Sequence, residues 1–383
     1  MNTDRKNWLV AIRATGLSGR RLIEAAEAAG GIDELVAAKR SRLQSLGLGT
    51  DTIADLKSPD EALIEADLRW LDGDEHHLLA WDDENYPPLL RSISSPPAAL
   101  FVDGNPNVLW QPQIAVIGSR NPTAGGLDHA RAFSNELCRA GMTVTSGLAS
   151  GIDSAAHGAA LDSGSDTVAV CGTGPDTVYP ASSRRLAERI RGQGALVTEL
   201  PTGNPPKRGH FPSRNRIISG LSLGVLVIEA GLNSGTLITA RQAGEQGREV
   251  FALPGSLHNP MAKGCHRLIR EGARLVETVQ DVLSELGPLA NELASALLAE
   301  LDESRPGPGS PPNPSRDAGG LLEDPEYRRL WEALAYDPRT VGELVQATGF
   351  PVQSVSSMLL MLDLQGKVQA HSSGRYSRAG GWT

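Results

Sequence analysis

Short apolar runs alternate with amphipathic stretches through the middle of the chain. The runs are rich in Val and Ile, and most are followed by a segment with helical periodicity; they are IAVIG, TVTSG, TVAVCG, ALVTEL, GVLVIEA and EVFALPG. Buried strands that alternate with helices are typical of an open, mostly parallel α/β sheet. We therefore predict such a core over residues 76–290, with ligand-binding loops gathered at the carboxyl edge of the sheet.

The first 75 residues have a different pattern. Helix-forming residues occur there in short blocks that are interrupted at Gly30–Gly31 and Gly47–Gly49. Residues 1–75 are therefore predicted to form a small helical module similar to SAM-like or helix-hairpin-helix units. Hairpins of this kind can hold a DNA phosphate on backbone amides, but packing or protein contact explains the same pattern.

The C-terminal part begins with a change in composition. Residues 303–320 are dominated by Pro, Gly and Ser, which predicts a flexible linker. Residues 321–383 then contain three helical segments followed by two short strands, the order found in a winged helix. The segment 352–365 would be the recognition helix, but it has almost no positive charge, so duplex DNA and protein contact both stay open as its role.

Composition places the chain among globular proteins. Of its 383 residues 40% are hydrophobic and 21% are charged, and no apolar run is long enough to span a bilayer. The first residues lack the apolar stretch of a signal peptide, and Cys138, Cys171 and Cys265 match no zinc spacing. We expect a cytoplasmic protein with reduced thiols and with no metal, cofactor or membrane contact. The net charge of -9 argues against a polycation, but nucleic-acid binding depends on where the positive charge lies.

Positive charge is concentrated beside an aromatic residue in the stretch KRGHFPSRNR. The residues that we single out here are Lys207, Arg208, Phe211, Arg214, Asn215 and Arg216. Between Pro205 and Leu223 the sequence has no acidic residue to pair with these cations. Arginine grips phosphate in bidentate fashion and an aromatic ring can stack on a base, so the stretch is a candidate anion pocket just before a helix that starts near Ile217. A core phenylalanine beside solvated arginines is the alternative.

Two strand-to-helix turns have residues suited to anion binding. They contribute Gly118, Ser119 and Arg120 from IAVIGSRNPTAGG, and Asn233, Ser234, Gly235 and Thr236 from EAGLNSGTLITA, with Lys263 following the last strong strand. Such turns present backbone N–H groups and a helix N-terminus to an anion. Because Arg120 replaces the second glycine of the dinucleotide fingerprint, a phosphodiester fits better than a buried dinucleotide.

A third turn raises the question of catalysis. In SGLASGIDSAAHGAA, Asp153 and His157 lie four residues apart and on one helical face. This pair could be catalytic, but no nucleophile signature accompanies it. Capping and packing of a helix start is the simpler interpretation.

These motifs together resemble the DNA-processing protein A (DprA/Smf) family. The resemblance depends on GSRNPT, GLASGIDSAAH, FPSRNRIISGLS, EAGLNSGTLITA, FALPG and KGCHRLIREGA, in this order, and it is dense from about Tyr86 to Val276. It implies an extended Rossmann-like, doubly wound core and a homodimer. It also implies a protein that binds incoming single-stranded DNA during natural transformation and loads the RecA recombinase onto it.

The resemblance implies that the GSR turn and the FPSRNR stretch form the single-strand pocket, with Lys207 or Arg208 as a nearby cation. The rival class is a Rossmann-type nucleoside-monophosphate phosphoribohydrolase. That class needs a PGGxGT loop with a catalytic acid, whereas this chain has LNSGTLITA with Glu229 as the only acid close by. A pure protein scaffold is a third alternative, and it leaves the cluster at Phe211 unexplained.

Overall fold

The structure is a computed structural model, and it describes most of the chain. The described residues are 3–286, 325–334, 338–364, 367–371 and 375–378. The predicted linker at 303–320 lies outside these residues.

The N-terminal part is helical, as the sequence predicts. Its helices are α1 (Thr3–Arg13), α2 (Arg20–Ala29), α3 (Ile32–Ala37), α4 (Arg40–Ser45), α5 (Thr50–Lys57) and α6 (Glu61–Leu71). Gly30, at a φ of 107°, ends α2 in the left-handed conformation that glycine tolerates best. The carboxylate of Asp60 accepts from two backbone N–H groups at the start of α6 and so fixes where that helix begins.

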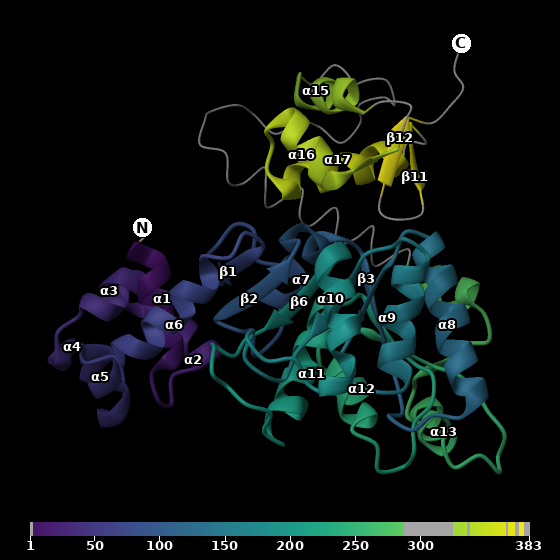
Figure 1. Cartoon of the computed structure of the whole chain (residues 1–383), viewed down its shortest axis with the longest axis horizontal. Coiled ribbons are helices and arrows are strands. Elements are labelled where there is room, and N and C mark those ends of the chain that lie inside the picture. The colour runs from purple at the N-terminus through teal and green to yellow at the C-terminus, as the bar shows by residue number, and fades with distance from the viewer. Residues whose placement is uncertain (1–2, 287–324, 335–337, 365–366, 372–374, 379–383) are drawn as a thin grey trace.

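A nine-stranded sheet forms the centre of the molecule (Figure 1). Its strands are β1 (His76–Ala80), β2 (Ala99–Gly104), β3 (Gln113–Ile117), β4 (Thr143–Ser146), β5 (Thr167–Val170), β6 (Ala195–Thr198), β7 (Gly224–Val227), β8 (Glu249–Ala252) and β9 (Arg274–Leu275). Their order is β1-β2-β6-β5-β4-β3-β7-β8-β9. The pairs β1–β2 and β2–β6 are antiparallel, and all the other pairs are parallel. The predicted α/β class is confirmed.

Helices cover both faces of this sheet. They are α7 (Pro88–Arg91), α8 (Ala124–Arg139), α9 (Ile152–Asp162), α10 (Arg184–Gln193), α11 (His210–Leu221), α12 (Thr236–Glu245) and α13 (Lys263–Arg270). In β3, Ala115 and Ile117 belong to the apolar cluster that includes α11 and α12, whereas Ile114 and Val116 belong to the cluster with α8 and α9. Because successive strand residues point to opposite faces, a continuous apolar run is buried on both sides.

The chain reverses its winding direction beside β3. The strands β4, β5 and β6 follow on one side of β3, and the chain then crosses back to place β7 on the other side. In doubly wound sheets a crevice opens at such a switch point, outside the carboxyl ends of the strands. The loops that follow β3 and β7 therefore mark the expected ligand-binding edge.

The C-terminal part is a winged helix. It contains α15 (Pro325–Ala333), β10 (Arg339–Thr340), α16 (Val341–Thr348), α17 (Val352–Leu364), β11 (Val368–His371) and β12 (Arg375–Arg378). Thr340 and Glu343 form a capping box that starts α16. Helix α17 contacts the 3₁₀ helix η1 (Pro106–Trp110), and Trp110 packs against the apolar cluster of the winged helix. Since η1 immediately precedes β3, this contact lies at the amino edge of the parallel strands.

Candidate nucleic-acid interface

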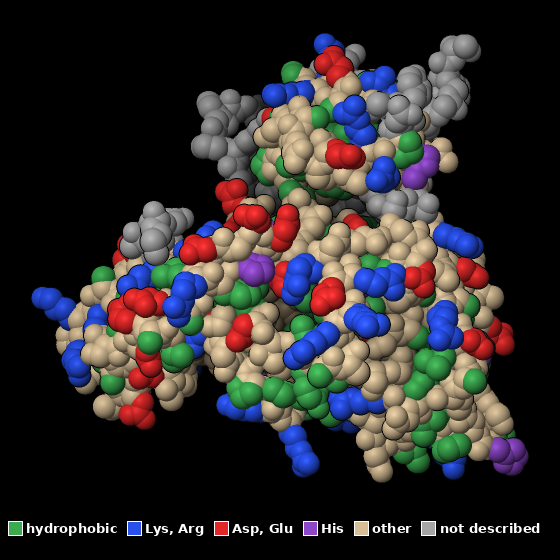
Figure 2. All heavy atoms as spheres, viewed as in Figure 1, with side chains coloured by type: hydrophobic (Ala, Val, Ile, Leu, Met, Phe, Trp, Pro, Cys, Tyr) green, Lys and Arg blue, Asp and Glu red, His purple; other side chains and the backbone are tan. Residues whose placement is uncertain are grey.

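A cleft of about 980 Å³ lies at the switch point. The loops after β3 and β7 form it, together with the first turns of α11, α12 and α13. Most of the predicted site residues line it: Gly118, Ser119, Arg120, Arg208, Phe211, Arg214, Asn215, Asn233, Ser234, Gly235, Thr236 and Lys263. Lys207 and Arg216 are not among the lining residues. In the region of α11 and α12, Figure 2 shows Lys and Arg side chains together with exposed hydrophobic ones.

An aromatic ring and a guanidinium meet inside the cleft. The Cζ atom of Arg120 lies 5.8 Å from the ring centroid of Phe211, a distance typical of cation–π contacts. The ring of Tyr179 lies 5.5 Å from the Phe211 ring at 45°. A Cβ atom at Gly172 would collide with the Phe211 ring, so glycine there allows the ring its position.

The side chains of Arg120, Arg208 and Lys263 are the exposed cations of the cleft. None of the three forms an ion pair with another residue in the described part of the chain, at a limit of 4.0 Å between nitrogen and oxygen. An unpaired cation that stays in water does not lose its hydration until a ligand arrives. These three positions are therefore the ones where a phosphate can add an ion pair without breaking another.

Helix α11 begins earlier than the sequence suggested. The stretch FPSRNR was expected to precede the helix, but α11 starts at His210 and includes it. Residues three or four apart share a helical face, so Phe211, Arg214 and Asn215 point to the cleft together. Arg216 lies on another face of the helix and does not line the cleft.

Arg216 forms an ion pair instead of facing the cleft. Its Nη1 and Nη2 atoms donate to the two carboxylate oxygens of Glu199 at 2.7 and 2.6 Å, and its Nε atom donates to the carbonyl of Ser95. Glu199 is 17 residues away along the chain and so lies outside the stretch from Pro205 to Leu223 that contains no acidic residue. Lys207 is exposed in the loop before α11.

Arg214 lines the cleft but is 95% buried, with 5% of its surface exposed. Its Nη1 atom donates to the carbonyl of Gly147 at 2.9 Å and to the carbonyl of Val170. The guanidinium therefore joins the carboxyl ends of β4 and β5, and burial lowers its pKa. Arg214 therefore supports the buried residues beneath the cleft, which we call its floor. This structural role differs from the phosphate contact that the sequence suggested.

Protein carboxylates already accept hydrogen bonds from backbone N–H groups at two of the strand-to-helix turns. At the start of α8, the backbone N–H and the hydroxyl of Thr123 donate to Glu229 at 2.8 and 2.7 Å. In the turn after β4, the backbone N–H groups of Gly147 and Ala149 donate to Asp153. At these two turns, positive charge for an external anion must therefore come mainly from side chains.

The turn after β3 is held directly on the start of α9. Gly151 has a φ of 85°, and a Cβ atom there would collide with the carbonyl oxygens of Ser119 and Arg120. The backbone N–H of Ile152 donates to the Ser119 carbonyl at 3.1 Å. On the other side the hydroxyl of Thr236 donates to the Gly118 carbonyl at 3.0 Å. This packing fixes the backbone from which Arg120 projects.

The residues Asp153 and His157 belong to the buried floor. Burial raises the pKa of Asp153, and burial together with the positive charge of Arg214 lowers the pKa of His157 to about 3. The Nδ1 atom of His157 lies 2.8 Å from the hydroxyl oxygen of Thr167. A histidine held neutral and fully buried cannot exchange protons with a substrate. The packing interpretation of this pair fits the geometry, although the N-cap residue of α9 is Gly151.

Some cleft residues were not predicted from the sequence. Leu232 and Ile238 are exposed large apolar residues of the cleft, and the Met261 sulfur lies 3.5 Å from the hydroxyl oxygen of Ser119. In the sequence, Ile238 looks like a core residue of α12, so its exposure could not be predicted. These side chains widen the apolar surface beside Phe211.

No cluster of three or more metal-ligating side chains is present among the described residues. In the same part of the chain, no helix combines the length and apolar character that crossing a bilayer requires.

The family model for DNA recombination-mediator protein A matches residues 77–287, and that for the DprA winged helix domain matches residues 308–374. The chain is 40% identical over 333 residues to protein Smf of Escherichia coli, covering 87% of this chain and 85% of that protein. It is 46% identical over 207 residues to DNA processing protein DprA of Streptococcus pneumoniae, covering 53% and 72%.

Solved structures give the same result. The X-ray structure of DNA processing protein A from Streptococcus pneumoniae superposes with a TM-score of 0.66 at 36% identity, covering 73% of this chain and 97% of that one. The protein from Helicobacter pylori, described for its single-stranded DNA binding mode, superposes with a TM-score of 0.51 at 28% identity, covering 57% and 97%. By sequence and by fold, this chain belongs to the DNA recombination-mediator protein A (DprA/Smf) family.

Proposed function

We propose that this protein binds single-stranded DNA in the cleft at the carboxyl edge of its sheet. The observation that carries the proposal is the position of the Phe211 ring beside Arg120 in an open cleft that also exposes Arg208 and Lys263. Base stacking on a ring is tolerant of sequence, and cations around it follow the backbone phosphates. In duplex DNA the base faces are stacked on one another, so a duplex can form only the phosphate contacts with the cleft.

Within that function, the protein protects incoming DNA and loads the RecA recombinase onto it during natural transformation and recombination, acting as a homodimer in the cytoplasm. Family membership supports this part of the proposal. Duplex DNA is a further ligand to be tested for the winged helix.

We also propose that the chain is a mediator and not an enzyme. In the rival phosphoribohydrolase, an acid near the LNSGT turn must be free to act on the substrate. Here both oxygens of Glu229 accept hydrogen bonds, from Thr123 and from the Nδ2 atom of Asn259 at 3.2 Å. Incubation with nucleoside monophosphates should release no ribose 5-phosphate, and turnover at an enzymatic rate would favour the rival.

The decisive experiment compares single-stranded and duplex oligonucleotides of about 20 nucleotides by fluorescence anisotropy. We expect tighter binding of the single strand, and an affinity that falls with salt at a log–log slope of about -0.7 for each phosphate neutralised. Titrations at about 50 and about 200 mM salt give that slope. Equal affinity of the isolated core for both forms would contradict the proposal.

A further inference from the structure

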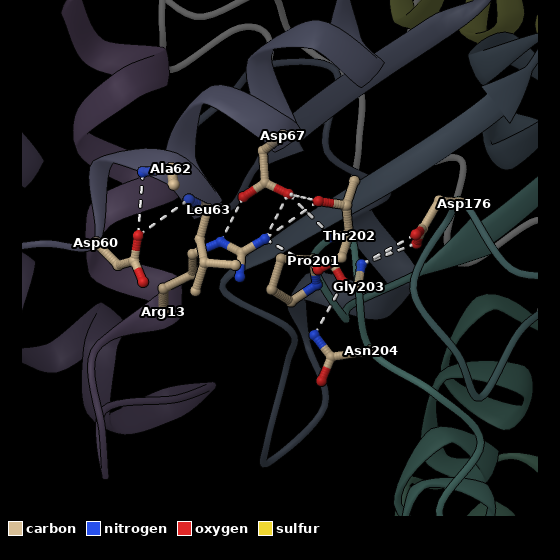
Figure 3. Close-up of polar contacts among 10 residues, drawn as sticks. All are labelled: Arg13, Asp60, Ala62, Leu63, Asp67, Asp176, Pro201, Thr202, Gly203 and Asn204. Carbon is tan, nitrogen blue, oxygen red and sulfur yellow. Dashed lines mark hydrogen bonds and ion pairs between the residues drawn. The ribbon is translucent and has the colours of Figure 1, made fainter.

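One ion pair between two N-terminal helices also contacts the loop that carries the cleft residue Arg208. The loop is residues 199–209, between β6 and α11. Arg13, the last residue of α1, donates to Asp67 of α6 through Nε at 2.6 Å and through Nη2 at 2.8 Å (Figure 3). The Asp67 side chain is fully buried, and that of Arg13 is 13% exposed.

Arg13 and Asp67 together form hydrogen bonds with every polar group of one loop residue, Thr202. The backbone N–H and the hydroxyl of Thr202 donate to Asp67 Oδ1 at 2.9 and 2.7 Å, and the Thr202 carbonyl accepts from Arg13 Nη2 at 3.0 Å. The two partners are 135 and 189 residues away from Thr202 in the sequence. Thr202 is itself 6% exposed, so the contact is a built junction between the helical module and the core.

The residues that follow Thr202 are held from the opposite side. The backbone N–H of Gly203 donates to both oxygens of Asp176 at 3.0 and 3.1 Å, and the Asn204 carbonyl accepts from the N–H of Gly174 at 2.9 Å. Both partners belong to the loop after β5. The segment 202–204 is therefore clamped between the helical module and the core; Figure 3 shows Asp67 at Thr202 and Asp176 at Gly203.

Three residues separate this clamp from the cleft cation Arg208. Pro205 and Pro206 come directly after Asn204, and a proline pair allows the backbone few conformations. The direction set at residues 202–204 is therefore transmitted to Arg208 and to the start of α11. Residues 205–209 are all exposed. The clamp therefore holds the loop on the N-terminal side of Arg208, while on the C-terminal side His210 Nδ1 lies 3.2 Å from the Gly172 carbonyl.

A buried ion pair is a costly way to join two helices, because both charges lose their hydration. The same helices α1 and α6 are also joined at the surface by Lys6 and Glu61, at 3.0 Å, without any contact to the loop. What distinguishes the buried pair is that its hydrogen bonds fix the geometry of Thr202.

We propose that Arg13 and Asp67 are positioning residues of the single-strand cleft, through which the N-terminal module holds the loop that presents Arg208. The proposal rests on the proposed function of the cleft. It gives the helical module a task that needs no DNA contact of its own.

The test uses the full chain with Asp67→Asn, Thr202→Val and the control Glu61→Gln. Trypsin cleaves after Lys207 and Arg208, so the rate of cleavage there in the free protein measures how often the loop leaves its clamp. Mass spectrometry identifies the cut, anisotropy with a labelled oligo-dT measures binding, and thermal melting reports folding.

We expect Asp67→Asn to be cut about fivefold faster at these two sites and to bind about five- to tenfold more weakly, because only a fraction of the molecules keep the loop in its binding conformation. Thr202→Val removes the hydroxyl and leaves no buried charge unpaired, so a smaller change in the same direction is expected. Glu61→Gln should match the wild type in all three measurements.

Each outcome decides the matter. If Asp67→Asn fails to fold, Thr202→Val gives the answer. If folded variants are cut and bind like the wild type, the positioning role is wrong. If the wild-type protein does not bind oligo-dT, the proposed function of the cleft is wrong, while the cleavage rates still report on the clamp.

Discussion

One arginine of the cleft and one of the winged helix each lie beside an aromatic ring, but they are used in opposite ways. In the cleft, Arg120 stays exposed beside the Phe211 ring. In the winged helix, Arg378 donates through Nε to the Trp331 carbonyl at 3.1 Å, and its Cζ atom lies 4.8 Å from the Trp331 ring. The pairing of arginine with an aromatic ring is the same in both, but Arg378 is already used to hold its own fold.

The positions of the two regions differ as well. The cleft lies at the carboxyl edge of the parallel strands, whereas α17 contacts η1 at the amino edge. Helix α17, which would be the recognition helix, therefore has part of its surface against the core. The comparison teaches that positive charge by itself does not identify a binding surface: the side chain must also be unpaired, exposed and next to a face on which a base can stack. Four predictions test this contrast, from the largest expected effect to the smallest.

The largest effect concerns the buried floor of the cleft. Because the pKa of His157 is about 3 in the folded protein and about 6.5 when unfolded, the unfolded chain binds more protons between these values. The free energy of unfolding should therefore fall as the pH drops below about 6.5, by about 2–3 kcal/mol at pH 4.5 from this residue. Urea unfolding at pH 7 and at pH 4.5 measures it.

His157→Gln is the matched variant for this prediction. It lacks the titrating group, so its stability should change less between the two pH values, even if it starts lower. An equal pH dependence of variant and wild type would mean that water reaches His157 in the folded protein, contrary to its burial in the structure.

The second effect concerns stacking in the cleft. Phe211→Ala should weaken single-strand binding by about 1–3 kcal/mol, or about 5- to 150-fold, because one stacked base loses its platform. The salt slope should stay nearly constant, since a phenyl ring displaces no counterion. Phe211→Tyr keeps the ring and is the control. A correctly melting Phe211→Ala that binds like the wild type would remove the ring from the site.

The third effect concerns charge in the cleft. Arg120→Ala should weaken binding by several-fold and reduce the salt slope by about 0.7, the amount for one phosphate contact on a single strand. Arg131→Ala removes an exposed arginine of α8 that is paired with Asp128 outside the cleft, and it should change neither quantity. Anisotropy titrations over a range of salt concentrations separate the two variants. An unchanged slope in Arg120→Ala would place the phosphates elsewhere.

The smallest effect is expected from the winged helix. A protein without residues 321–383 should keep its single-strand affinity within about twofold, because the cleft and the docked α17 lie at opposite edges of the sheet. The truncated and full-length proteins are compared in one titration series. A tenfold loss would show that the winged helix contributes to the single-strand site and would overturn the contrast. The expectation that proteases cut first within 303–320 is a separate prediction about the linker.

The fold class could be predicted from the sequence because the signal is local. Apolar runs such as IAVIG must be buried on both faces, and alternation with helices then leaves a parallel sheet as the solution. The same reasoning brought the turns after β3 and β7 to one edge, and Arg120 and Asn233 do line one cleft. The start of α11 was missed because FPSRNR contains a proline and polar residues that favour a turn as much as a first helical turn.

The sequence by itself determined the types of side chain available to this protein and the elements that carry them, including the charges near Phe211. Only the tertiary structure decided which arginine does what: Arg120 stays free, Arg214 bonds the ends of β4 and β5, and Arg216 pairs with Glu199. The physical reason is that a charge is made available or used by partners that are distant in the sequence. The carboxylate of Asp67 lies 135 residues from Thr202, and no local pattern records that they meet.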